Sequence, residues 1–271
     1  MALPFALTAP SLIPAVVACI AFFVVELLMI YRAIQTRGFE PYTYLCTFGL
    51  IRAIAYATRA AWSQEADPTA LTPTVYVAEI LSTAGFVIVL FAEYGALAQW
   101  VQHGLRRGEA SPLWESRFFR IARAATLLFQ ILSIVATVKL LDVKSLEEFN
   151  NAQTLRYAAT YGLFAVGIVH LLLTAAYFGY FVSLGNERPR VRHFVTIMGI
   201  SVMATIELVY KIVVVTSPAT AAINSQEAYL YGLAALPEFV IMVWSLVFNL
   251  AELKMEKMMP GDAEIAMSRR G

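Results

Sequence analysis

The chain has 271 residues, of which 59% are hydrophobic and only 14% charged, with 20 Lys and Arg residues against 19 Asp and Glu residues. Soluble domains average about 45–50% apolar and about 25% charged residues, so this chain lacks the charge that a soluble surface of its size needs. The composition therefore excludes an ordinary cytosolic enzyme, a disordered protein and a nucleic-acid-binding protein, and it predicts a polytopic membrane protein.

Seven apolar runs follow one another along the chain, and each is long enough to cross a bilayer as a helix, which takes about 20 residues. The runs show no period-2 alternation, which excludes a transmembrane β-barrel. We predict an all-α membrane protein with a seven-transmembrane-helix bundle, forming a single domain over residues 1–252 and a short cytoplasmic tail over residues 253–271. The expected helices cover residues 12–32, 42–62, 74–100, 118–138, 157–181, 194–215 and 229–251.

Lys and Arg residues in the loops, in the tail and at the adjoining ends of the apolar runs are distributed unevenly between the two sides of this bundle. Thirteen lie in the first, third and fifth loops and the C-terminal tail, whereas the opposite side has three, Lys139, Lys144 and Arg156. Cytoplasmic loops carry the excess of positive charge. The N-terminus is therefore expected outside and the C-terminus in the cytoplasm, in the plasma membrane or an endomembrane.

Nine charged residues lie within the apolar runs, where each costs roughly 2.5–3.5 kcal/mol on insertion scales. Five are acidic and four are basic, which indicates internal pairing more than a channel for one sign of charge. Depth along the runs places the nine at three levels: Arg52 and Glu238 near the midplane, Arg59, Glu79, Glu207 and Lys211 toward the outside, and Glu26, Glu93 and Arg123 toward the cytoplasm.

Spacing brings several of these charges onto shared helix faces. Arg52 and Arg59 are seven residues apart, which places them on one side of the second helix. Glu207 and Lys211 are four residues apart on the sixth. We predict a buried polar cluster that is either a ligand-binding or proton-coupled site or a structural ionic clamp. Its members are Arg52, Tyr56, Arg59, Glu79, Glu207, Tyr210, Lys211 and Glu238.

Other polar positions are interpreted as structural. Gln130 and His170 lie mid-helix, and no second His or carboxylate stands three or four residues from His170, so it is read as a core residue and not as a metal ligand. Pro237 predicts a kink in the last helix beside Glu238. Phosphate-binding loops, zinc-binding motifs and nucleophile elbows are absent from the sequence. We expect no cofactor, no metal and no assigned catalytic residue.

Short stretches resemble a known family. They are Arg52-Ala-Ile-Ala-Tyr56-Ala-Thr-Arg59, Phe118-Phe119 with Leu128-Phe129-Gln130, Glu207-Leu-Val-Tyr210-Lys211, and Tyr231-Gly-Leu-Ala234-Ala-Leu-Pro237. Their order and spacing resemble the fungal RTA-like family of seven-helix, lipid-translocating exporters linked to sterol, sphingoid-base and drug stress. The resemblance implies a seven-helix fold and an amphiphilic ligand.

The chain departs from the family pattern at charged positions. The family's acid in the second helix is Arg52 here, and the family's base in the sixth helix is Glu207. A reciprocal exchange of this kind predicts that the two side chains pair. The family's Asp in the last helix is replaced by Ala234, and Glu238, one turn further on, is the expected substitute.

We therefore expect a protein that binds or translocates an amphiphilic lipid, sterol or drug-like molecule, with membrane lipids or such a molecule as its partner and no nucleic acid. Two alternatives remain. A seven-helix ligand-sensing receptor would signal through the basic loops around Arg106, Arg107 and Arg188. A terpene-cyclase-like membrane enzyme would use Glu79 or Glu238 as a general acid. The lack of catalytic motifs favours a non-enzyme.

Overall fold

The structure is a computed structural model, and it describes residues 10–36, 40–65, 67, 70–105, 113–183, 189–217 and 227–248. Over these ranges the protein is all-α and contains seven helices, of which the third and the seventh consist of successive pieces. The predicted fold class is confirmed at this level. The predicted tail over residues 253–271 and the start of the chain lie outside the described residues.

The helices follow the predicted segments in chain order. The first two are α1 (Leu12–Gln35) and α2 (Glu40–Trp62), and the third comprises α3 (Pro73–Ala84) and α4 (Phe86–Leu105). Then come α5 (Leu113–Leu141), α6 (Leu146–Ser183) and α7 (Pro189–Thr216). The last helix comprises α9 (Glu227–Leu230), the π-helix η1 (Tyr231–Ala235) and α10 (Leu236–Val247).

Six stretches of helix are long and apolar enough to cross a membrane, and they fall in every helix except α2. They are Leu12–Gln35, Pro73–Val101, Arg117–Leu141, Leu146–Tyr180, Val191–Thr216 and Glu227–Val247. The helix α2 has 23 residues but carries Arg52, Arg59 and several hydroxyl groups, which lower its apolarity. The six stretches indicate an integral, multi-pass helical membrane protein.

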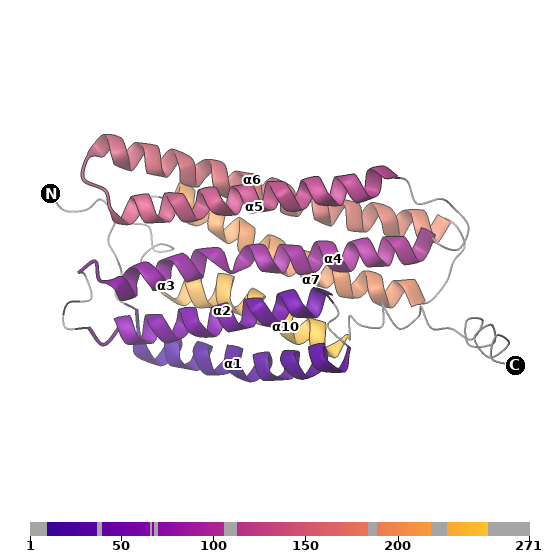
Figure 1. Ribbon diagram of the computed structural model, residues 1–271, viewed down its shortest axis with the longest axis horizontal. Coiled ribbons are helices and arrows are strands. Elements are labelled where there is room, and N and C mark those ends of the chain that lie inside the picture. Colours follow the sequence, from indigo (N-terminus) through magenta and orange to yellow (C-terminus); the bar gives the residue numbers. More distant parts are fainter. Residues whose placement is uncertain are drawn as a thin grey trace, which may run out of the picture.

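The helices run roughly along the long axis of the molecule (Figure 1). In this view α5 and α6 lie along one side and α1, α2 and α10 along the other, with α4 and α7 between them. Phe22, Phe48, Phe86 and Met242 are fully buried where these helices meet. Large apolar side chains such as Ile13 on α1 are exposed on the outer faces, an arrangement suited to contact with lipid.

The helix α6 begins at Leu146, well before residue 157, where the apolar run predicted it to start. Ser145 explains the earlier start, because its Oγ accepts a hydrogen bond from the Glu148 N–H at 3.2 Å and so caps the first turn. Glu148 completes the spacing of a capping box. As a result Arg156, predicted to lie in a loop, is part of a helix.

Candidate functional site

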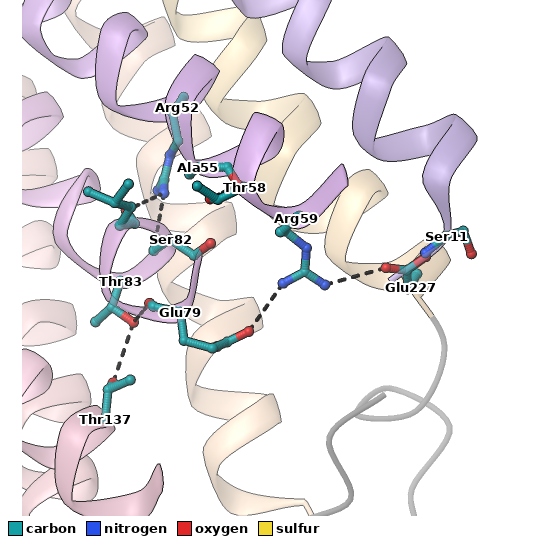
Figure 2. A network of polar contacts seen from close by, with 11 residues as sticks. Ser11, Arg52, Ala55, Thr58, Arg59, Glu79, Ser82, Thr83, Thr137 and Glu227 are labelled. Atoms are coloured by element: carbon teal, nitrogen blue, oxygen red, sulfur yellow. Dashed lines mark hydrogen bonds and ion pairs between the residues drawn. The ribbon is translucent and has the colours of Figure 1, made fainter. Parts of the chain in front are cut away.

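Arg52 reaches from α2 to the point where the third helix is interrupted. The helix α3 ends at Ala84, and the Gly85 N–H donates to the Leu81 carbonyl at 3.3 Å. The Arg52 Nη1 donates to the carbonyl of Ser82 at 2.7 Å and to that of Leu81 at 3.2 Å (Figure 2). A cationic side chain therefore adds a donor to two carbonyls at the end of α3, inside the bundle.

Two neighbouring residues complete this contact. Gln130 on α5 donates from Nε2 to the next carbonyl, that of Thr83, at 2.9 Å. A Cβ at Gly85 would lie 3.1–3.2 Å from the Arg52 guanidinium, so the absence of a side chain gives Arg52 its place against the backbone. The boundary between α3 and α4 therefore provides both the space and the hydrogen-bond acceptors for the Arg52 guanidinium.

The last helix is irregular on the other side of Arg52. The N–H of Leu236 donates to the carbonyl of Tyr231, an i to i+5 bond that defines the π-helix η1. Pro237 follows and has no N–H to donate. Glu238 lies in the first turn of α10, and its Oε1 pairs with the Arg52 Nη2. The π-turn ends just before Pro237, and Glu238 follows it against Arg52. The kink at Pro237 itself stays a prediction.

Glu207 and Lys211 extend the charged contacts onto α7. The Lys211 Nζ lies 2.7 Å from the Glu207 Oε1, and the Arg52 Nη2 lies 4.0 Å from the same oxygen. Lys211 also stands over the ring of Phe86, 4.1 Å from its centroid. The predicted pairing of Arg52 with Glu207 is therefore present at the outer limit of an ion pair, and Glu238 is the closer partner.

Arg59 forms a second group of contacts toward the end of the bundle that holds Ser11 (Figure 2). Its Nη1 lies 3.2 Å from Glu79 on α3, and its Nη2 lies 3.4 Å from Glu227 on α9. Glu227 also accepts the Ser11 N–H at 2.8 Å. Arg156 on α6 interacts electrostatically with Glu79.

Together these side chains form the central charge cluster, with four cations and four anions among the described residues. Its members are Arg52, Arg59, Arg156, Lys211, Glu79, Glu207, Glu227 and Glu238. The two tyrosines predicted to belong to it lie beside it: Tyr56 stacks on Phe22 with centroids 5.4 Å apart, and Tyr210 interacts with Arg59 and Glu207. All eight residues of the predicted set are therefore in one region.

Arg156 and Glu227 are members of the central charge cluster that sequence reasoning missed. The signal for Arg156 was the capping pattern at Ser145, which extends α6 to include it. Glu227 stands in the first turn of α9, outside the predicted run that begins at residue 229. With both included, the cluster has equal numbers of acidic and basic side chains.

A group of polar side chains separate from the central charge cluster lies inside the bundle on α4, α6 and α7. The His170 Nδ1 is 2.8 Å from the Glu93 Oε1 and 3.2 Å from the Ser201 Oγ. All three side chains are buried. His170 is a core residue, as predicted, and its partners stand on other helices, where no spacing along the chain could show them.

The remaining charges predicted to be intramembrane lie apart from both groups. Arg123 on α5 pairs with Glu40 at 3.1 Å, and both are partly exposed. Glu26 on α1 is buried, 3% exposed, and no Lys or Arg in the described ranges pairs with it. Glu26 lies beside Gly49, where a Cβ would overlap its carboxylate.

We expect Gly85→Ala to lower the free energy of unfolding by about 1–2 kcal/mol, because the new Cβ crowds the Arg52 guanidinium. Gly179→Ala is the matched control, since a Cβ there meets nothing within 4 Å. In both variants the change from Gly to Ala favours the helical backbone by about 1 kcal/mol. Thermal unfolding in detergent measures the difference. A Gly85→Ala protein as stable as Gly179→Ala would contradict the close fit of Arg52.

Comparison of the chain with protein-family models, with curated proteins and with solved structures finds no match. The resemblance to the RTA-like family therefore stays a prediction, and the function has to be argued from the geometry.

Proposed function

We propose that the protein binds an amphiphile with a zwitterionic head group at the central charge cluster and moves it between the two leaflets of a membrane. The observation that carries this proposal is the meeting of two interrupted helices at Arg52. Its guanidinium contacts both the end of α3 and Glu238 after the π-turn.

Interrupted helices are a recurring way to build a polar site at membrane depth. Non-helical backbone is tolerated there only where it is buried in protein or lines a polar cavity. In transporters such breaks carry substrate and ion sites and serve as hinges. The α3–α4 junction, where Gly85 keeps helical dihedral angles, and the π-helix η1 are milder irregularities that face one cation. Rearranging the contacts of Arg52 frees both helices to bend there.

Two members of the cluster are partly exposed. Lys211 is 26% and Glu79 is 27% exposed, whereas Glu207 is fully buried. A head group can therefore contact Lys211 or Glu79 first, before it reaches the buried members of the cluster.

The equal numbers of acidic and basic side chains in the cluster favour a zwitterionic head over a singly charged one. An incoming anionic group replaces Glu207 on Lys211, and an incoming cationic group replaces Lys211 on Glu207. The exchange leaves the buried net charge unchanged, which avoids the large cost of an unpaired charge in hydrocarbon. The proposed class of ligand agrees with the one that the RTA-like resemblance implies.

The orientation predicted from the basic loops completes the proposal. With the N-terminus outside, the end that contains Arg59, Glu79 and Glu227 faces the outer leaflet, and the Arg52 contacts lie deeper in the bundle. A head group then moves inward from the more exposed members of the cluster to the buried ones.

The proposal is tested with the purified protein in liposomes that contain a fluorescent short-chain phosphatidylcholine. The rate at which inner-leaflet fluorophore becomes accessible to a membrane-impermeant quencher is measured. We expect a rate at least about 10-fold above that of protein-free liposomes, which corresponds to about 1.4 kcal/mol of barrier. Lys211→Gln should remove most of this gain, and Lys211→Arg should retain it.

Lys144→Gln is the control for the fluorophore measurement, because Lys144 is an exposed residue in the α5–α6 turn and should leave the rate unchanged. Equal rates with and without the wild-type protein would contradict the proposed function. Formation of a cyclised isoprenoid, or ligand binding that depends on a cytoplasmic partner, would instead support the enzyme or the receptor.

A further inference from the structure

The buried group of Glu93, His170 and Ser201 lies apart from the central charge cluster. Glu93 comes from α4, His170 from α6 and Ser201 from α7, and the exposed fractions of Glu93 and His170 are 2% and 0%. Among the described residues, the His170 Nε2 and both Glu93 oxygens have no hydrogen-bond partner of acceptable geometry. Buried polar atoms without partners are uncommon in proteins, so these three require a physical reason.

The contacts of Ser201 fix where the first proton of the imidazole lies. The Ser201 Oγ donates to the carbonyl of Ile197 at 3.0 Å, so it faces the His170 Nδ1 as an acceptor. Nδ1 therefore carries a hydrogen, which it directs toward Ser201, while the Glu93 Oε1 lies 2.8 Å from the same nitrogen. Because the serine and the carboxylate both lie beside Nδ1, the three residues are not arranged as a nucleophilic triad, in which the serine pairs with Nε2.

With only that proton, the group carries a net charge of −1 from the Glu93 carboxylate. In the described part of the chain no Lys or Arg pairs with Glu93. Tyr94, the next residue on α4, packs its ring on His170 with centroids 4.7 Å apart and donates its hydroxyl to the Val166 carbonyl. The adjacent phenol therefore supplies no positive charge.

The cation from α5 faces another side of α4. Arg123 lies against Gly95, where a Cβ would be 3.4 Å from its Nη2, and it pairs with Glu40. Gly95 is two residues after Glu93, so the two point about 200° apart around the helix. A lone buried carboxylate is costly, and the remaining way to neutralise it is a second proton.

We propose that Glu93 and His170 form an internal proton-binding site, which holds one proton beyond the Nδ1 hydrogen and releases it as a unit. The additional proton occupies the His170 Nε2 or a Glu93 oxygen, and Ser201 keeps the ring orientation constant in both states. Binding changes the net charge of the group from −1 to 0. The site is independent of the proposed amphiphile transfer, since it involves none of the central charge cluster.

The test is solid-state NMR on the full-length protein in lipid, with 15N-labelled histidine and 13C-labelled glutamate side chains. The chain has three histidines, so His170→Gln assigns the His170 signals by their loss. We expect the wild-type protein to show the second proton on Nε2 or on the Glu93 carboxyl and to lose it in one step as the pH is raised. Glu93→Gln should abolish that step and leave His170 with its Nδ1 hydrogen alone.

Ser201→Ala and Glu147→Gln complete the experiment. Ser201→Ala should keep the second proton but lose the fixed tautomer, and Glu147→Gln, at an exposed position on α6, should change neither signal. A wild-type spectrum that shows only the Nδ1 hydrogen at every pH at which the protein stays folded would overturn the site. An unchanged step in Glu93→Gln would overturn the role of Glu93. Neither result depends on whether lipid is moved.

Discussion

Replacement of Arg52 by Gln is expected to lower the free energy of unfolding by about 3–5 kcal/mol, the usual cost of removing one partner from a buried ion pair. The substitution leaves Glu238 and Glu207 with Lys211 as the remaining nearby cation, inside a bundle where both carboxylates are buried. It also removes the charged donor from the Leu81 and Ser82 carbonyls.

A double-mutant cycle separates the ion pair from the backbone contact. Glu238→Gln alone should be destabilising, and the double variant Arg52→Gln with Glu238→Gln should be more stable than the sum of the two losses predicts, by about 1–3 kcal/mol. Unfolding in mixed micelles gives the four free energies, with the exposed Arg117→Gln as a control for loss of a positive charge. Additive losses would show that Arg52 and Glu238 act separately.

The same substitution at two buried glutamates is expected to have opposite effects. Glu207→Gln should lower the free energy of unfolding by about 2–3 kcal/mol, because it removes a carboxylate that pairs with Lys211 and Arg52. The loss is below that expected for Arg52→Gln because Lys211 is partly exposed to solvent. Glu26→Gln removes no ion pair, and the neutral amide avoids a buried charge, so its stability should equal or exceed that of the wild type.

Thermal unfolding of the two variants in parallel provides the measurement, since both lose one carboxylate from a buried position. A Glu26→Gln protein that unfolds as readily as Glu207→Gln would mean that Glu26 has a polar role that its contacts do not reveal. A Glu207→Gln protein as stable as the wild type would contradict the pairing of Glu207 with two cations.

The seven helices were predictable because each segment is long and rich in apolar residues, although α2 falls outside the six stretches that are apolar enough to cross a membrane. The central charge cluster was predictable because charged side chains in hydrocarbon must be paired. Spacing along α2 and α7 placed Arg52, Arg59, Glu207 and Lys211 on the correct faces. Hydropathy did not predict the start of α6 at Leu146, because the first turns of this helix contain polar residues such as Glu147 and Asn150. Such residues are common at the start of a capped helix, but they do not belong to an apolar run.

Contacts between helices that are distant in the sequence could not be predicted from hydropathy or residue spacing. Glu93 and His170 are 77 positions apart in the chain and carry no shared pattern. The boundary between α3 and α4 at Gly85 could not be predicted either, because isolated glycines are common in apolar helices. The role of this glycine is visible only in its contact with Arg52. The π-turn at Tyr231–Ala235 was not predicted, because the sequence indicates only a kink at the nearby Pro237.

The position of the Arg52 partner also constrains how the protein is made. Glu238 follows Arg52 by 186 residues, so the ribosome completes α2 long before it synthesises α10. During that interval Arg52 lacks its nearest carboxylate, and α2 is also the helix that falls outside the six apolar stretches. Stable insertion of α2 is therefore expected to depend on the later helices, and a protein truncated before α10 should insert α2 less efficiently.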